Sequence, residues 1–164
     1  MSKNNLTAET LKSLFHYDSE TGFFTRKVAA NGKWKVGSRA GYVNQKGYVV
    51  IHFLGYAYYA HRLAWLYVYG HFPEFMIDHI NGVKTDNRIQ NLREVTNSVN
   101  MQNRKTPNRE SKSGLLGVSP YANKWVAQIS VNGKLHYLGF FESKYVAHEA
   151  YLSAKRKLHD GCTI

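Results

Sequence analysis

The sequence predicts an α+β protein built from two small units. Three kinds of pattern indicate this class: short aromatic and β-branched runs separated by turn dipeptides, apolar residues recurring at helical spacing, and one long polar stretch. That stretch, residues 104–113, has no apolar residue except Pro107 and is typical of a linker. We therefore expect one domain at residues 1–104 and another at 114–164, joined by residues 105–113.

The first unit is expected to begin with a helix and to continue in hairpins. Thr7 can cap a helix in which Leu11 and Leu14 recur at helical spacing. Residues 60–69 carry apolar side chains on one helical face, which predicts a buried helix that ends at Gly70. The strands expected between these helices, with their turn dipeptides, are 23–25, Asn31-Gly32, 41–43, Lys46-Gly47 and 48–53.

The middle of the chain is expected to form two strands and a helix. The strands are predicted at residues 75–79 and 92–95, and a short helix at residues 96–104. The loop of residues 80–90 between the strands is too polar for a hydrophobic core to hold. Hydrogen bonds or a ligand must therefore hold its side chains.

The second unit is predicted to be a three-stranded antiparallel sheet covered by one helix, at residues 143–159. Asn132-Gly133 closes a two-residue hairpin whose register places Gln128 opposite Tyr137. Apolar residues along the two strands then lie on the face that the helix covers. That face is expected to carry Trp125, Ala127, Ile129, Leu138 and Phe140, and the open face Lys124, Gln128, Ser130, Leu135 and Tyr137.

The charge of the chain favours a polyanionic partner. Lys and Arg number 22 against 11 Asp and Glu, which gives a formal net charge of +11 at pH 7. Residues 21–73 contain no acid at all but seven cations. Nucleic acid is the first candidate partner of such a surface. The cations expected to bind the DNA backbone are Arg26, Lys27, Lys33, Lys35 and Arg39.

The cysteine content and the apolar segments of the chain indicate its cellular compartment. Cys162 is the only cysteine, so the chain has no internal disulfide and no cysteine-based zinc site. The first residues are polar and lack an apolar signal-peptide core, and the most apolar stretch, residues 55–70, is short and carries His61 and Arg62. We therefore expect a cytoplasmic protein without a membrane partner.

Asp78-His79, Asn91 and Asn100 form the strongest candidate site. Cutting a phosphodiester in water requires a base and a cation that offsets the charge on the phosphate and the leaving oxygen. Histidine is a suitable base near neutral pH, and a carboxylate with an amide oxygen fits Mg²⁺ or Mn²⁺. The structural alternative makes Asp78 a turn-forming acid and the asparagines turn and cap residues.

The run IDHINGVKTDNRIQNLREVTNSVNMQN, with AHRLAWLYVYGHFP before it, resembles the ββα-metal motif of HNH endonucleases. The form is that of phage and intron-encoded homing enzymes. The resemblance implies that Asp78 and Asn100 bind one Mg²⁺ or Mn²⁺ ion per active site and that His79 is the general base. It also implies that Asn91 braces the loop by hydrogen bonds to backbone.

Two further residues near this motif have open roles. Arg104 follows Asn100 by one helical turn and shares its face. It either stabilises the phosphate during cleavage or is a solvated arginine at the edge of the linker. His61 is expected to be a packed, hydrogen-bonded histidine at a helix start rather than a ligand.

Residues 117–161 carry a recognisable pattern of core residues: Trp125, Ala127, Ile129, Leu138-Gly139, Phe141, Ala147, Ala150-Tyr151 and Ala154. On this pattern the segment resembles the AP2 domain, which is also appended to phage HNH enzymes. In that family the open sheet face enters the major groove of DNA. The matching positions here are Ser119, Gln128, Ser130 and Tyr137, and they lack the arginines that contact guanine. Gln128 suits adenine and Lys124 suits phosphate. The alternative is that these are ordinary solvent-facing strand residues.

Together these features predict a metal-dependent, homing-type DNA endonuclease that nicks or cuts double-stranded DNA in the cytoplasm of a bacterial host. It is expected to act as a monomer or homodimer. A non-catalytic DNA-binding regulator that keeps both folds is the main alternative. An RNA-directed binder is less favoured, because neither unit shows an RNA-binding motif.

Overall fold

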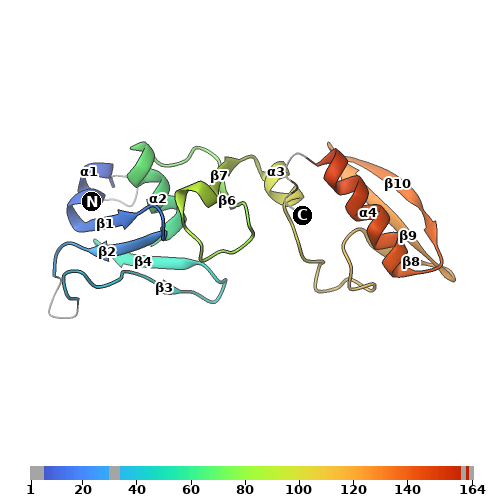
Figure 1. The fold of residues 1–164 in the computed structure, drawn as a ribbon, viewed down its shortest axis with the longest axis horizontal. Coiled ribbons are helices and arrows are strands. Elements are labelled where there is room, and N and C mark those ends of the chain that lie inside the picture. The colour runs from blue at the N-terminus through green and yellow to red at the C-terminus, as the bar shows by residue number, and fades with distance from the viewer. Residues whose placement is uncertain (1–5, 30–33, 160–161, 163–164) are drawn as a thin grey trace. The chain divides into compact units, whose positions relative to one another are not determined.

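A computed structural model describes residues 6–29, 34–159 and 162 of the chain. It combines helices with small antiparallel sheets, in agreement with the expected mixed class (Figure 1). The chain divides into two compact units, Met1–Val95 and Thr96–Ile164. The helix α3 (Asn97–Gln102), which we expected in the nuclease domain of residues 1–104, is grouped with the second unit.

The described residues of the first unit, 6–29 and 34–95, form two helices and three small antiparallel sheets. The sheets have the strand orders β1-β2, β3-β4-β5 and β6-β7. Its elements in chain order are α1 (Ala8–Leu14), β1 (Phe15–Asp18), β2 (Phe23–Arg26), β3 (Tyr42–Val43), β4 (Val49–Phe53), β5 (Tyr56–Tyr59), α2 (Ala60–Tyr69), β6 (Met76–His79), the 3₁₀ turn η2 (Ile89–Asn91) and β7 (Leu92–Val95).

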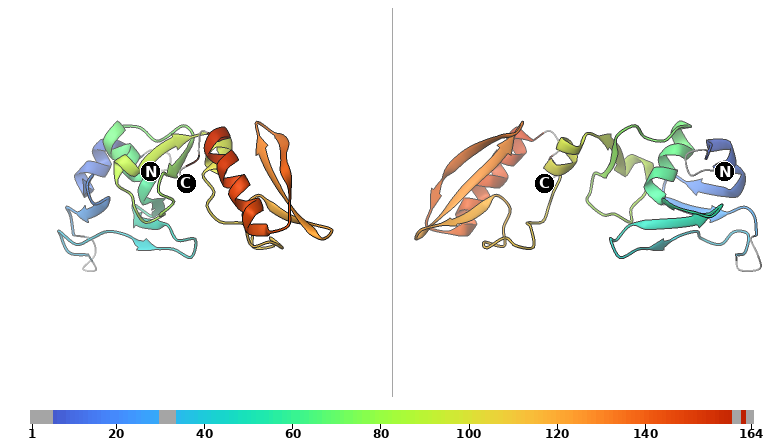
Figure 2. Two further views of the ribbon diagram at one scale, coloured as in Figure 1. Left: turned by 45° about the vertical axis from the view of Figure 1, so that its right-hand side comes forward. Right: turned by 180° about the vertical axis from the view of Figure 1, so that it is seen from behind.

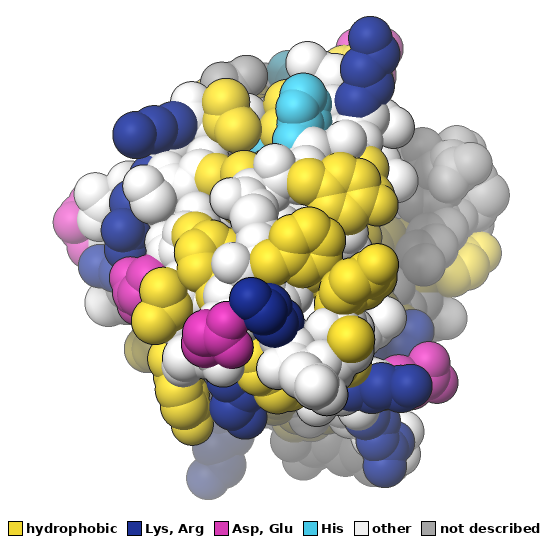
Figure 3. Space-filling view, turned by 90° about the vertical axis from the view of Figure 1, so that its right-hand side faces the viewer, with side chains coloured by type: hydrophobic (Ala, Val, Ile, Leu, Met, Phe, Trp, Pro, Cys, Tyr) yellow, Lys and Arg dark blue, Asp and Glu magenta, His cyan; other side chains and the backbone are white. Residues whose placement is uncertain are grey.

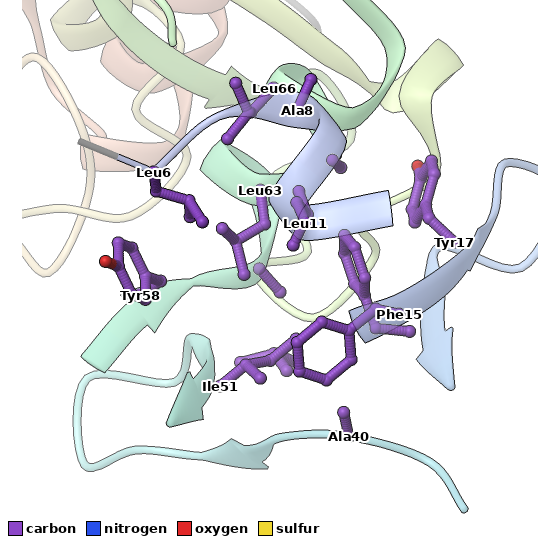
Figure 4. Packing of buried hydrophobic residues seen from close by; sticks show 14 of the residues in the cluster. Leu6, Ala8, Leu11, Phe15, Tyr17, Ala40, Ile51, Tyr58, Leu63 and Leu66 are labelled. Atoms are coloured by element: carbon purple, nitrogen blue, oxygen red, sulfur yellow. The ribbon is translucent and has the colours of Figure 1, made fainter. Parts of the chain in front are cut away.

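The core of the first unit packs the two helices against strands of the two N-terminal sheets (Figure 4). Leu11, Ile51 and Leu63 are fully buried there. Thr7 caps α1 through its side-chain oxygen, as predicted. Gly70 ends α2 in the left-handed conformation at φ 82°, so both predicted helices are confirmed.

Two strands of this unit were not predicted. The chain passes from α1 directly into β1 and from β5 directly into α2, with no turn residue to mark either boundary. The hairpin turn predicted at Lys46-Gly47 is confirmed, and the side-chain oxygen of Asn44 accepts hydrogen bonds from two of its backbone N–H groups. The turn predicted at Asn31-Gly32 lies outside the described residues.

Beyond α3, the described residues of the second unit form a three-stranded antiparallel sheet and one long helix, as expected. Its strands have the order β10-β9-β8, and α4 covers one face of the sheet (Figure 2). Asn132 and Gly133 both have positive φ, and Gln128 lies opposite Tyr137, so the predicted hairpin and register are confirmed. The elements after α3 are β8 (Val118–Tyr121), β9 (Lys124–Val131), β10 (Lys134–Phe141) and α4 (Lys144–Leu158).

One side chain of this sheet faces the opposite way from the prediction. The register shifts between Tyr137 and Gly139, so one extra residue sits in β10 and every later side chain changes face. Phe141, not Phe140, packs toward α4. Phe140 is 55% exposed and contacts Tyr121 on the open face, at 5.0 Å between ring centroids. Figure 3 shows apolar side chains gathered on this side of the molecule.

Candidate active site

Asp78 and His79 end strand β6 of the β6-β7 hairpin. The hairpin register places Asp78 opposite Arg93 and His79 opposite Leu92. The two polar residues are only 8% and 4% exposed. Buried titratable groups need partners, so the contacts around each define what it can do.

The carboxylate of Asp78 is held by Arg93. Both Nε and Nη2 of Arg93 donate to Oδ2 of Asp78, at 3.1 and 2.9 Å. Arg93 is not among the site residues predicted from the sequence, although the pairing of β6 with β7 places it opposite Asp78. The guanidinium offsets the buried negative charge and fixes the orientation of the carboxylate.

The imidazole of His79 is oriented by Asn87. Nε2 of His79 lies 3.2 Å from Oδ1 of Asn87, a residue only 2% exposed. The hydroxyl of Tyr17 donates to the backbone carbonyl of Asn87 at 2.7 Å, and the Asn87 amide donates to the carbonyl of Thr85 at 3.3 Å. We assign the proton of the neutral ring to Nε2, because Asn87 Oδ1 only accepts; Nδ1 is then the basic nitrogen.

Burial sets the protonation state of this histidine. Desolvation lowers the pKa of His79 below its usual value, although the hydrogen bond with Asn87 and the charge of Asp78 act in the opposite direction. His79 is therefore neutral near pH 7 and able to accept a proton. The role of His79 as the general base stays a prediction.

Asn91 ties together the two ends of the polar loop. Its amide donates to Asn81 Oδ1 at 3.0 Å and to the carbonyl of Asp86 at 2.8 Å, and its Oδ1 accepts from the backbone N–H of Asn81 at 3.0 Å. Hydrogen bonds therefore hold this loop, as the polar sequence requires. The part that Asn91 plays in catalysis stays a prediction.

Asp86 anchors the same loop through charge. Arg88 Nε and Nη2 donate to its two carboxylate oxygens at 2.8 and 2.6 Å, and Asn81 Nδ2 donates at 2.7 Å. The hydrogen bond from Arg88 is the main cause that lowers the pKa of Asp86 to about 2. Protonation of Asp86 in acid would release both partners.

We expect Asp86→Asn to remove an acid-sensitive part of the stability. The folded-state pKa lies below the unfolded value, so the contribution is present above pH 3.8 and is lost as the pH falls toward 2. Because the Arg88 side chain is 41% exposed, water screens the pair and the expected loss near pH 7 is about 1 kcal/mol. Urea denaturation of both proteins at neutral pH and near pH 2.5 measures it; an unchanged difference between the two pH values would contradict the assignment.

His61 lies directly against His79. The two ring centroids are 5.1 Å apart and the rings are nearly perpendicular, at 81°. The side chain is 7% exposed, so the predicted packing is confirmed. The predicted hydrogen bond is not present: His61 has no hydrogen-bond partner among the described residues, and its Nδ1 is fully buried.

Asn100 and Arg104 belong to the second unit. Asn100 is half-buried on α3, whose N-terminus is capped by Thr96. The guanidinium of Arg104 donates to the carbonyl of Thr106 and to Oδ1 of Asn108, both at 2.8 Å, so local linker residues hold it. The pairing of Asn100 with Asp78 on a metal, and the role of Arg104 at the phosphate, stay predictions.

The candidate DNA-binding cations of the first unit differ in exposure. Arg26 is buried, with its guanidinium 4.2 Å from the centroid of the Trp34 ring. Burial also lowers its pKa. Lys33 lies outside the described residues. The exposed members are Lys27, Lys35 and Arg39.

The candidate DNA-binding residues of the second unit share the open sheet face. Gln128 is half-buried there, while Ser130 and Tyr137 are exposed. Lys124 is also exposed but forms an ion pair with Glu142 at 2.8 Å. The face therefore offers aromatic and small polar groups rather than a row of free cations.

The donor chemistry of the site suits a hard cation. Within the described part of the chain, no cluster of three or more His, Cys, Asp and Glu side chains could hold a metal ion. Mg²⁺ and Mn²⁺ do not require three protein ligands, because they keep several waters and bind through one or two carboxylates together with substrate phosphates. The buried, oriented carboxylate of Asp78 fits such a ligand, and Arg93 is the outer partner that ligating carboxylates usually have.

The segment that contains this site is similar to a known family. Residues 58–102 match the HNH endonuclease family model. The HNH match includes Asp78, His79, Asn91 and Asn100 but ends before Arg104 and the three-stranded sheet. It supports a nuclease whose substrate is DNA. No curated protein and no solved structure gives a match, and no helix among the described residues is long and apolar enough to cross a membrane.

Proposed function

We propose that the protein is a metal-dependent DNA endonuclease of the homing type, with His79 as its general base. The observation that carries the proposal is the buried, neutral imidazole of His79, oriented by Asn87 beside the carboxylate of Asp78. The match of residues 58–102 to HNH endonucleases supports the reaction class. The phage or mobile-element origin and the cytoplasmic location are part of the same proposal.

The reaction is hydrolysis of one phosphodiester bond. Nδ1 of His79 takes a proton from water as the water oxygen attacks phosphorus, and the bond from phosphorus to O3′ breaks. The products are a 5′-phosphate and a 3′-hydroxyl, whose proton comes from solvent. Asp78 and Asn100 would hold one Mg²⁺ or Mn²⁺ ion, which when bound offsets the negative charge on the phosphate and the leaving oxygen.

The rest of the chain would bind the duplex. Lys27, Lys35 and Arg39 are exposed cations that suit phosphates, while buried Arg26 suits this role less well. In the AP2-like second unit, the open face with Gln128 would contact bases in the major groove. The division of labour is then cleavage by the first unit and choice of site by the second.

A nicking assay tests the proposal. Supercoiled plasmid is incubated with the protein and Mg²⁺, with Mn²⁺, or with EDTA. Conversion to nicked or linear DNA is expected with the divalent ions and not with EDTA. A protein that binds DNA tightly but cuts with neither ion would overturn the proposal in favour of a DNA-binding regulator.

Asp78→Ala should weaken the binding of Mn²⁺ to the complex with DNA. The expected loss is at least about 10- to 100-fold, since that is the cost of removing even an outer partner at a metal site. Calorimetric titration of Mn²⁺ into the complex measures it, with Glu9→Ala, a change of an exposed acid on α1, as the control. Unchanged affinity in Asp78→Ala would remove Asp78 from the metal site.

Tyr137→Ala should weaken DNA binding about tenfold. A hydrogen bond to a charged group contributes about 1.5–3 kcal/mol, and the hydroxyl of Tyr137, the most exposed aromatic residue of the open face, can donate one to a phosphate of the duplex. Tyr145→Ala is the matched control, because Tyr145 is similarly exposed but lies on α4, which covers the opposite face. Fluorescence anisotropy measures the affinities. Equal losses in the two variants would contradict binding by the open face.

A further inference from the structure

His61 is packed on three sides by aromatic rings of the candidate active site. Its ring stacks on Tyr59, at 5.4 Å and 15°, and contacts Tyr48 at 5.4 Å between centroids. The third neighbour is His79, against which it packs edge to face. A phenylalanine would fill such a space equally well, so packing alone does not explain a histidine.

Burying the two ring nitrogens of His61 without hydrogen bonds is unfavourable for folding. Leaving a buried polar group without a partner destabilises the folded protein, because the group loses its hydrogen bonds to water and gains none in return. Nδ1 is fully buried and unpartnered, and Nε2 makes no hydrogen bond to the described residues. An unsatisfied buried group in a native protein calls for an explanation, and a catalytic role is one such explanation.

The buried environment also determines the protonation state of the His61 imidazole. Burial, with a smaller effect of neighbouring His79, lowers the pKa of His61 to about 3. The ring is therefore neutral and carries one N–H. We assign the proton to Nε2, because a buried acceptor without a partner is more often tolerated than a buried donor, and Nδ1 is the enclosed atom.

We propose that His61 is a second catalytic histidine, whose Nε2–H donates a hydrogen bond to a non-bridging oxygen of the scissile phosphate. This rests on the proposed function, since it names a substrate contact of the same site. A phosphate attacked by water on His79 must lie beside that ring, and His61 is its perpendicular neighbour. A fixed neutral donor in a dry site stabilises the charge that develops on the phosphate without taking part in proton transfer.

The phosphate is a better partner than the metal. Mg²⁺ and Mn²⁺ prefer oxygen ligands, so a nitrogen donor is not what such an ion requires. A phosphate oxygen, in contrast, accepts hydrogen bonds strongly from N–H groups. The substrate thus supplies the partner that the protein does not.

Kinetics of variants test this role. His61→Phe keeps the ring packing and removes the donor, so we expect the rate at saturating DNA to fall roughly 10²- to 10³-fold with little change in DNA affinity. His61→Gln places an amide N–H near the position of Nε2 and should recover part of the rate. His71→Phe, at an exposed histidine of the same unit, is the control. Cleavage by His61→Phe within threefold of the unaltered protein would overturn the proposal.

Sulfur substitution distinguishes a phosphate contact from support of His79. Replacing each non-bridging oxygen of the scissile phosphate by sulfur weakens the hydrogen bond that this oxygen accepts. One of the two substitutions should slow the unaltered protein more than it slows His61→Phe. If both substitutions slow the two proteins equally, His61 does not touch the phosphate.

A binding measurement keeps the inference separate from the proposed activity. ¹⁵N NMR of the imidazole rings is recorded during titration with a short synthetic duplex in EDTA, where cleavage cannot occur. The Nε2 signal of His61 should move on saturation while that of His71 stays. A protein that fails to cut DNA refutes the proposed function, whereas an unmoved His61 signal refutes the contact.

Discussion

His79→Ala should reduce DNA cleavage by about 10²- to 10⁴-fold, the range that a positioned general base contributes. The imidazole is the buried basic group that ends β6, and Asn87 fixes its orientation. Alanine removes the proton acceptor but none of the exposed cations that suit the DNA backbone, so affinity in EDTA should be nearly unchanged. Single-turnover cleavage of plasmid with Mn²⁺ measures the loss.

Two controls decide whether this loss reports on the base. His52→Ala, at an exposed histidine that hydrogen bonds to Tyr42, should cut at the unaltered rate. Because burial lowers the pKa of His79, the unaltered protein should also keep its rate as the pH falls through 6.5 and lose it only when His79 becomes protonated. Full activity of His79→Ala, or a rate loss centred well above pH 6.5, would show that another group is the base.

The local rules of turns and registers were predictable from the sequence. A two-residue Asn-Gly loop admits few geometries, so the pairing of β9 with β10 followed from residue types alone. The same rule failed beyond Tyr137, because the extra residue in β10 has no turn signal of its own. A one-residue shift then exchanged the positions of Phe140 and Phe141.

In the candidate site, too, residues close together in sequence were predictable and contacts between distant residues were not. Asp78, His79 and Asn91 lie close together in sequence, and their spacing within a recognisable motif made them predictable. Tyr17, in contrast, reaches Asn87 across 70 positions of the chain. No periodicity or spacing encodes such a contact; it follows from how β1 packs against the loop. The sequence predicts that His61 is packed, but the three rings that enclose it, and so its lack of a hydrogen bond, follow from the fold.

Gly22→Ala should destabilise the first unit by about 2–5 kcal/mol and also slow cleavage. Gly22 has φ 72°, which costs an L-residue about 1–2 kcal/mol. An added Cβ would lie 2.5 Å from the backbone nitrogen of Arg88 and 2.5 Å from the carbonyl carbon of Asn87. These are backbone atoms, so relief requires the loop to move, and overpacking of this kind costs about 1–3 kcal/mol more.

Gly37→Ala separates the cost of the backbone conformation from the cost of the steric clash. Gly37 has almost the same backbone conformation, φ 79°, but no atom lies within 4 Å of the added Cβ. Urea denaturation should therefore show about 1–2 kcal/mol for Gly37→Ala and a larger loss for Gly22→Ala. Cleavage at a temperature where both variants are folded should be slower only in Gly22→Ala, because displacement of Asn87 releases Nε2 of His79. Equal stability losses in the two variants would contradict the clash of the added Cβ with the loop. A folded Gly22→Ala protein that cuts at the full rate would show that the position of Asn87 does not control the base.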